Sequence, residues 1–304
     1  MEEVHPNKEK LKYQLQRTME RKSSRKRTVN KLVTAFCIIC VGLAIIPLGS
    51  ILFEVIKNGI SAFSWEFLTE RPGSIGSGKG GIGPAFQGTL ITVGIASIVA
   101  APVGVVAGIY LAEFAGKGLF PHAIRFFNDV LTGLPSIVLG IVGYIVIVLT
   151  LGSFSVWAGS FALSIIMIPI VVRVTEESLK VVPNSVKEAG YSLGIPKWKI
   201  TLRITLKTAF SGVLTGIVLG ISRIAGETAP LIMTILGTSL FFTRFDEPVD
   251  ALPLRIWRLA SQPYESAHAQ GWGAALLLIL IVLLFSVTLR FLASRKGFNV
   301  KAAV

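Results

Sequence analysis

The sequence predicts an all-α integral membrane protein with six transmembrane helices, and three observations support this prediction. Hydrophobic residues make up 52% of the 304 residues and charged residues only 15%, too little charge to cover the surface of a soluble domain. The apolar residues gather in long blocks, and about 20 such residues in a helix cross a bilayer. The positive charges fall almost entirely between these blocks, which leave no room for a second large soluble domain.

Six apolar blocks are the predicted spans. The first block is too long for the core of a signal peptide and no clear small-residue cleavage site follows it, so we interpret it as a retained anchor. The chain then divides into a basic tail (1–31), a membrane domain (32–294) and a short C-terminal tail (295–304). In order, the predicted spans are 32–56, 86–112, 130–151, 156–174, 209–236 and 271–291.

The distribution of Lys and Arg predicts the orientation of the chain. Assigning alternate loops to the cytoplasm places 23 of the 30 Lys and Arg residues inside and six outside. Because positive residues accumulate on the cytoplasmic side, both termini are expected there. Membrane topology and contact of the basic tail with anionic lipid explain the net charge of +13, so no nucleic acid is expected as a partner.

Two patterns resemble cofactor sites, and neither meets the chemical requirement. Cys37 and Cys40 have CxxC spacing but lie inside the first block without a third thiol or a nearby His, so no metal site is expected. Segment 73–80 nearly matches a phosphate-binding P-loop, but Gly80 stands where a Ser or Thr would hold magnesium, and no strand precedes it. We therefore expect no catalytic residue and no ATPase machinery in this chain.

The predicted cytoplasmic loop 175–207 contains a helix followed by a sharp break. The helix presents Glu188, Ala189 and Gly190. Gly194 and Pro196 end it, because Gly accepts a left-handed turn and Pro cannot continue a helix. The pattern fits either a docking helix for another subunit or an ordinary amphipathic connector.

The fifth span carries a stripe of small residues and an ionisable pair. Gly212, Gly216 and Gly220 recur every four residues, which lets another helix approach closely. Arg223 and Glu227 follow, and on an ideal helix all five lie within an arc of about 80°. A charge at the bilayer centre costs at least about 2.5–3.5 kcal/mol. The pair is either a structural salt bridge or, as we favour, a site on an anion path, since a guanidinium stays charged and donates paired hydrogen bonds.

Asp129 and Arg173 are weaker candidates for such a path. Arg173 comes at the end of the fourth span, where an anchor at the membrane edge is the simpler interpretation. Asp129 stands at the start of the third span and suits an N-terminal cap, because the helix dipole favours an acid there. Either residue could also line an inner vestibule.

The loop before the fifth span resembles the EAA loop of ABC importer permeases. The resemblance is carried by Glu188 and Ala189, then Gly194, and then Ile204 and Leu206. In that family the loop forms a coupling helix that docks in a cleft of the ATPase subunit. This sequence departs from the pattern at two positions, because Gly190 replaces a usual Ala and Lys207 a usual Pro.

A more specific resemblance points to phosphate importer permeases of the PstA type. Residues 222–231 (Ser-Arg-Ile-Ala-Gly-Glu-Thr-Ala-Pro-Leu) carry most of it, and the matches run from about residue 80 to 290. The supporting stretches are 88–90 (Gly-Thr-Leu), 110–113 (Tyr-Leu-Ala-Glu), 132–138 (Thr-Gly-Leu-Pro-Ser-Ile-Val) and 252–254 (Leu-Pro-Leu).

This resemblance implies a type I ABC importer permease fold and a heteromeric transporter in a prokaryotic plasma (inner) membrane. The implied partners are a second, similar permease, two ATPase subunits that carry ATP and magnesium, and an external phosphate-binding protein. In the family, the counterparts of Arg223 and Glu227 are tied to phosphate passage. The resemblance thus implies a non-catalytic subunit whose loop 188–206 couples it to ATP hydrolysis.

Three other interpretations stay open at this point. The same machine could carry another oxyanion, such as sulfate or molybdate. A stand-alone secondary anion transporter would usually show inverted repeats with broken helices, and the sequence has no obvious internal repeat. A membrane enzyme lacks support, since no nucleophile–base pair or metal cluster is apparent.

Overall fold

The computed structural model describes residues 6–74, 79–116 and 118–296, and within these ranges the secondary structure is helical apart from two isolated backbone bridges. The chain divides into two compact units, Met1–Ile56 and Lys57–Val304. The all-α class is confirmed.

The first unit is formed by helix α1, which begins at Pro6 and ends at Gly59, just inside the second unit. From Val29 onward α1 is apolar and long enough to cross a membrane, and this part contains the predicted first span. Large apolar side chains from Val29 to Phe53 are exposed. Such a surface needs lipid or another chain to cover it. The helix passes residue 31, the predicted end of the basic tail, without a break.

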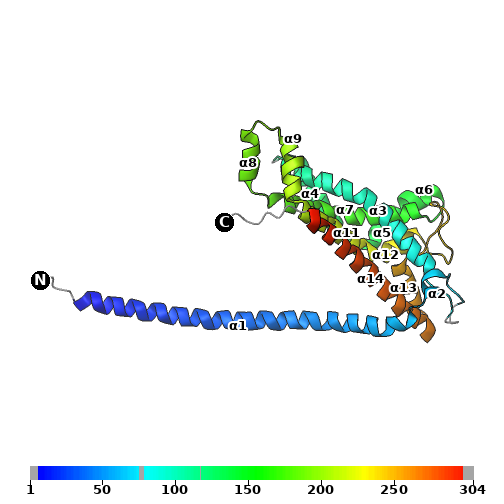
Figure 1. Cartoon of the computed structure of the whole chain (residues 1–304), viewed down its shortest axis with the longest axis horizontal. Coiled ribbons are helices and arrows are strands. Elements are labelled where there is room, and N and C mark those ends of the chain that lie inside the picture. Colours follow the sequence, from blue (N-terminus) through cyan, green and yellow to red (C-terminus); the bar gives the residue numbers. More distant parts are fainter. Residues whose placement is uncertain (1–5, 75–78, 117, 297–304) are drawn as a thin grey trace. The chain divides into compact units, whose positions relative to one another are not determined.

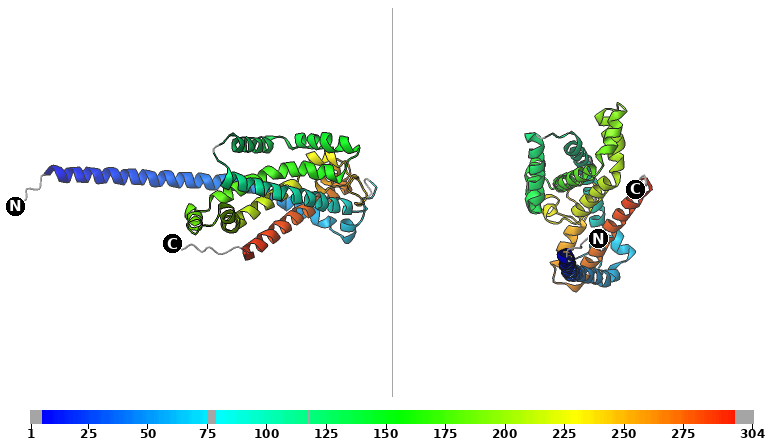
Figure 2. Two further views of the ribbon diagram at one scale, coloured as in Figure 1. Left: turned by 90° about the horizontal axis from the view of Figure 1, so that it is seen from above. Right: turned by 90° about the vertical axis from the view of Figure 1, so that its left-hand side faces the viewer.

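The second unit is a helical bundle with two distinct ends (Figures 1 and 2). Helices α8 and α9 lie at one end, and α2 and α13 lie at the other, with long helices between them. The early elements of the unit are η1 (Ile60–Ala62), α2 (Trp65–Thr69), α3 (Gly83–Ile109), the π-helical η2 (Tyr110–Phe114) and α4 (Leu119–Gly133).

Helix α7 (Val156–Lys180) lies at the centre of the bundle, with 67% of its most apolar stretch buried. It packs along α3 because glycines on α3 leave no side chain between the helices. A Cβ atom at Gly104 would lie 2.7 Å from Val171, and one at Gly108 would lie 2.6 Å from Thr175. Small residues at such seams let helices approach closely in a membrane. Helix α7 continues six residues beyond the predicted end of the fourth span.

The predicted third span, 130–151, is not one helix. Helix α4 ends at Gly133, α5 (Ser136–Gly143) begins after Pro135, and the two arms differ in direction by 104°. Proline explains the break, because it lacks an N–H and forces the preceding residue, Leu134, out of the helical region. The π-helical η3 (Tyr144–Val148) and α6 (Leu149–Leu151) complete the second arm.

The predicted fifth span, 209–236, is also interrupted. Helix α11 (Phe210–Ala225) ends before Gly226, and a separate helix, α12 (Ala229–Thr234), follows. Before α11, the chain bends by 71° from the arm Lys197–Thr208. That arm consists of α9 (Lys197–Ile200), the π-helical η4 (Thr201–Thr205) and α10 (Leu206–Thr208), and α8 (Asn184–Ser192) precedes it.

The end of the bundle that holds α13 (Leu252–Ala260) is tied to the start of α3. A Cβ atom at Gly88 would lie 2.0 Å from the carbonyl oxygen of Asp250, so only glycine fits there. The neighbouring Thr89 Oγ1 accepts a hydrogen bond of 2.7 Å from the backbone N–H of Leu252. These contacts bring together two of the short stretches, 88–90 and 252–254, that carry the resemblance.

Helix α14 (Glu265–Lys296) closes the unit and extends the predicted sixth span at both ends. Among the described residues, four helices are long and apolar enough to cross a membrane unbroken, and each bent pair adds one more span if its two arms count together. The six predicted spans therefore correspond to four continuous helices and two broken ones.

Candidate functional site

Arg223 and Glu227 lie on either side of a helix end. Arg223 is in the last turn of α11, whereas Glu227 follows Gly226 in the non-helical link to α12. Glu227 is thus not on the continuous helical face that the sequence pattern predicted. The link nevertheless returns its side chain to α11, where Arg223 Nη1 forms an ion pair with Glu227 Oε1.

The two members of this pair have opposite environments. The Glu227 side chain is 6% exposed and the Arg223 side chain is 59% exposed. A buried carboxylate needs a charged partner, because isolated burial of the ionised form is very costly. Glu227 therefore holds one side of the guanidinium at the bundle surface, while the other side stays open. An Arg with free N–H donors can bind an oxyanion.

The glycine stripe of α11 faces α7. Cβ atoms at Gly212 and Gly216 would lie 2.5 Å from Ser178 Oγ and 2.8 Å from Val174 Cβ, respectively. A Cβ atom at Gly220 would lie 2.9 Å from Met167 Cγ. The stripe thus positions α11, and the Arg223 at its end, directly against the central helix.

The short helices that follow the two helix breaks pack against each other. Gly140, on α5, packs against Pro230 at the start of α12, because a Cβ atom there would lie 2.6 Å from the Pro230 Cα. Helices α5 and α12, each of which follows an interruption, are therefore neighbours. Non-helical backbone at membrane depth is tolerated where it is buried in protein or lines a water-filled cavity.

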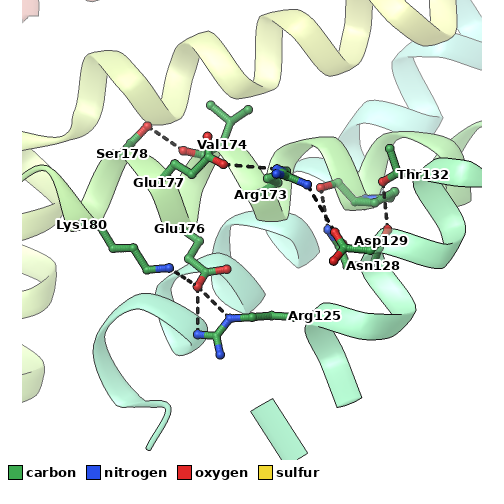
Figure 3. Close-up of polar contacts among 11 residues, drawn as sticks. Arg125, Asn128, Asp129, Thr132, Arg173, Val174, Glu176, Glu177, Ser178 and Lys180 are labelled. Atoms are coloured by element: carbon green, nitrogen blue, oxygen red, sulfur yellow. Dashed lines mark hydrogen bonds and ion pairs between the residues drawn. The ribbon is translucent and has the colours of Figure 1, made fainter. Parts of the chain in front are cut away.

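Asp129 and Arg173 contact each other across α4 and α7 (Figure 3). Arg173 Nη1 donates to Asp129 Oδ1 over 3.3 Å, and its Nε donates to Glu177 Oε1 over 3.2 Å. Asp129 lies inside α4, so the predicted cap at the start of a span is wrong. Arg173 is two turns before the end of α7 and does not mark the end of that helix.

A second cluster beside this pair was missed by the sequence analysis. Arg125 Nε and Lys180 Nζ both donate to the buried Glu176 Oε1, over 2.9 and 2.6 Å (Figure 3). The two clusters line one cavity of about 190 Å³. Its three cations face three carboxylates, so it offers no excess positive charge to an anion. The i, i+4 spacing of Glu176 and Lys180 was a readable signal, but the contact with Arg125 was not.

Helix α8 holds the residues of the predicted coupling helix. Glu188 and Ala189 are exposed, whereas Gly190 is buried where a Cβ atom would lie 2.9 Å from Ile200 Cδ1. Gly194 has φ +71°, the left-handed conformation that reverses the chain after α8. The exposed acid and small residue are thus available to another protein, and the glycine is used inside the loop.

An ion pair anchors α8 to the membrane helices. Lys187 Nζ lies 2.6 Å from Glu113 Oε1, and the two side chains are 15% and 6% exposed. Glu113 is in η2, at the end of α3, and belongs to the stretch 110–113. Lys187 is one of the 23 positive residues assigned to the cytoplasm, and no local sequence pattern predicts its contact with a residue 74 positions away.

The described residues contain no group of three or more His, Cys, Asp and Glu side chains that could hold a metal ion. Cys37 and Cys40 are exposed free thiols on α1. Of the P-loop-like segment 73–80, residues 75–78 lie outside the described part of the chain, and Gly80 has φ +86° in a backbone bridge with Pro72.

Comparison with known protein families and proteins matches this chain to membrane components of transport systems. Residues 104–297 match the family described as "Binding-protein-dependent transport system inner membrane component". The chain is 37% identical over 282 residues to "Phosphate transport system permease protein PstA" of Yersinia pestis, covering 93% of this chain and 96% of that protein. It is 38% identical over 282 residues to the protein of the same name from Mycobacterium leprae (strain TN), covering 90% and 92%.

Solved structures agree on the fold. Two structures of the MetNI methionine ABC transporter in inward-facing conformations each superpose with a TM-score of 0.56, at 15% and 16% sequence identity. The alignments cover 71% of this chain and 94% and 97% of those chains. At this identity the likeness concerns the fold, which is that of an ABC importer permease.

Proposed function

This chain belongs to the PstA family of binding-protein-dependent transport system inner membrane components, and we propose that it is the membrane permease subunit of an ATP-driven importer of inorganic phosphate. The observation that carries the proposal is the 37–38% sequence identity between this chain and PstA proteins. The aligned region covers 90–93% of this chain and includes Arg223 and Glu227. Subunits of this kind are generally non-catalytic, and the ATPase activity belongs to partner chains.

Arg223 is our proposed contact for phosphate on the translocation path. The buried Glu227 fixes one side of the guanidinium, and the exposed side is free to donate to an oxyanion that carries about −1.5 to −2 charges at neutral pH. The Glu227 carboxylate offsets part of the guanidinium charge, so binding stays weak. A weak site suits conduction, which requires that the anion both bind and leave.

The proposed coupling element is α8. Its exposed Glu188 and Ala189 would dock on an ATPase subunit, and Gly194 would let the helix end sharply beside that partner. ATP-driven closure of two ATPase subunits would then move α8 and open the permease pair outward. The proposed assembly also contains a second, similar permease and an external phosphate-binding protein. ATP and magnesium would be held by the ATPase subunits.

Reconstitution of the complex tests the proposal. Proteoliposomes containing this chain, its co-purified partner subunits and the binding protein should take up phosphate only when ATP is supplied on the α8 side. Excess sulfate and molybdate should not compete. Preference for either of those oxyanions would replace phosphate as the substrate, and phosphate uptake by this chain alone would identify a secondary transporter instead.

A further inference from the structure

A cavity of about 250 Å³ is lined in part by residues of α13. Helix α13 lies at the opposite end of the bundle from α8 (Figure 1). Residues 72–74 and 81–82 contribute to the lining of the cavity, together with residues of helices α13 and α14. Among the described residues, the lining includes two guanidinium groups and several neutral donors but no carboxylic acid. Its polar lining residues are Ser74, Ser239, Arg255, Arg258, Gln262, Ser266 and Gln270.

The charge of Arg255 is balanced from outside the cavity. Arg255 Nε donates to Asp250 Oδ2 over 2.6 Å, and the Asp250 side chain is fully buried. Burial raises the pKa of Asp250, although Arg255 and Arg258 both favour its ionised form. This pair supports the wall of the cavity and adds no net charge to it.

Arg258 supplies the excess positive charge. It donates one hydrogen bond, from Nη2 to the carbonyl oxygen of Leu236, and no carboxylate of the described residues lies within ion-pair distance of it. Its remaining N–H groups are available to a ligand. An Arg with open donors, in a cavity whose described lining carries no carboxylate, favours an anion with several acceptor oxygens.

The backbone beneath Arg258 is shaped to hold the guanidinium in place. Leu236 and Gly237 have φ of 59° and 76°, and a Cβ atom at Gly237 would lie 2.7–2.8 Å from three guanidinium atoms of Arg258. A non-glycine residue with positive φ is uncommon and costs energy. The chain accepts this conformation where it packs directly against Arg258.

We propose that this cavity is a binding site for inorganic phosphate, distinct from Arg223 and held mainly by Arg258. The inference rests on the proposed function, under which the α8 end is cytoplasmic and this cavity faces the outside. In that orientation the cavity receives the anion before the anion reaches Arg223. The cavity volume is several times larger than the roughly 30 Å³ that one water molecule occupies in the liquid, so a partly hydrated tetrahedral anion fits.

The test measures phosphate binding to the purified transporter complex in lipid nanodiscs, by equilibrium dialysis with radiolabelled phosphate. An Arg223→Gln background removes the contribution of the other proposed site. In this background we expect saturable binding that Arg258→Gln weakens about tenfold or more, and that Arg258→Lys weakens less. The matched control is Arg244→Gln, which removes an exposed Arg paired with Asp246 outside the cavity.

A backbone variant tests the same site without changing a charge. Gly237→Ala should weaken binding because its Cβ displaces Arg258, whereas Gly152→Ala should not. Gly152 has a similar φ of +71° but open space around it. Thermal unfolding and subunit co-purification identify variants that fail to assemble. If Arg258→Gln is one of them, the binding measured for Arg258→Lys tests the site in its place.

Absence of saturable binding in the Arg223→Gln background, or equal binding by the Arg258→Gln and Arg244→Gln variants, would overturn the proposal. ATP-driven phosphate uptake by the same wild-type complex would in that case leave the proposed function intact. If the complex instead transports sulfate, the proposed function fails, and labelled sulfate becomes the probe for the same variants.

Discussion

Arg223 and Glu227 form an ion pair for which we propose a role in transport as well as in packing. The carboxylate is buried and needs the guanidinium, while the guanidinium is more than half exposed and can serve a ligand as well. If the pair is only a structural salt bridge, mutation should have a different effect than if Arg223 lies on the anion path. A double variant distinguishes these two hypotheses.

Arg223→Gln should abolish ATP-driven phosphate uptake while the complex still assembles. The single change also leaves a buried carboxylate without its partner, which costs about 3–5 kcal/mol in known buried pairs. Arg223→Gln combined with Glu227→Gln should therefore regain thermal stability and remain inactive. Recovery of uptake in the double variant would show that the pair is structural only. Uptake and thermal unfolding measured on the same preparations distinguish these outcomes.

Gly88→Ala should destabilise the end of the bundle that holds α13, because its Cβ would collide with the Asp250 carbonyl oxygen. Overpacking of this kind costs about 1–3 kcal/mol. Gly94→Ala is the matched control, since it lies on the same helix with nothing within 4 Å. We expect a lower unfolding temperature for the complex with Gly88→Ala alone, and equal temperatures would contradict the close contact.

At the scale of elements, helix breaks and glycine seams organise the candidate path. The stripe on α11 sets the distance to α7, and the break after Ala225 allows Glu227 to turn back towards Arg223. Helix α8 is fixed from two sides, by Gly190 against Ile200 and by the Glu113–Lys187 ion pair. A force applied to α8 would thus reach the end of α3 directly.

Exchanging the charges of that ion pair tests this connection. Lys187→Glu or Glu113→Lys alone should uncouple ATP hydrolysis from phosphate uptake, because each places two like charges in a mostly buried contact 2.6 Å across. The double exchange should restore at least part of the coupling. The ratio of phosphate transported to ATP hydrolysed is the measurement. Unchanged ratios in both single variants would exclude the pair from coupling.

Substitutions at Glu188 and Gly194 test the proposed docking of α8 on an ATPase subunit. We expect Glu188→Lys to weaken co-purification of the ATPase subunits, since this exposed acid would face the partner. Gly194→Val should also reduce coupling, because a β-branched residue resists a φ of +71°. Unchanged assembly and uptake after both substitutions would argue against α8 as the docking element.

At the scale of the whole molecule, the membrane orientation decides which end of the bundle can meet the proposed ATPase subunits. The predicted topology places α8 in the cytoplasm and the cavity at Arg258 outside. Single cysteines at the exposed Ser192 and Ser261, in a chain with Cys37 and Cys40 replaced by Ser, test this. A membrane-impermeant maleimide should label position 261 in intact cells and position 192 only after permeabilisation. The reverse pattern would invert the topology.

The sequence alone determined the class and location of the protein, because hydropathy and charge act through composition and need no contacts. Six apolar blocks and the excess of positive charge in alternate loops predicted a membrane protein that crosses the bilayer several times. The resemblance of the loop 188–206 and of residues 222–231 to known importer permeases then implied the function. The glycine stripe predicted a close helix seam because spacing on one helix is a local property.

Only the tertiary structure decided where the helices break and which charges meet. Pro135 was visible in the sequence, but a proline in a membrane helix can also be accommodated without a break, as Pro169 is within α7. The pairs Glu113–Lys187 and Asp250–Arg255, and the open Arg258, depend on how the chain packs around them. Apolar blocks predict which segments leave water, whereas the contacts of buried charges depend on packing between segments distant in the chain.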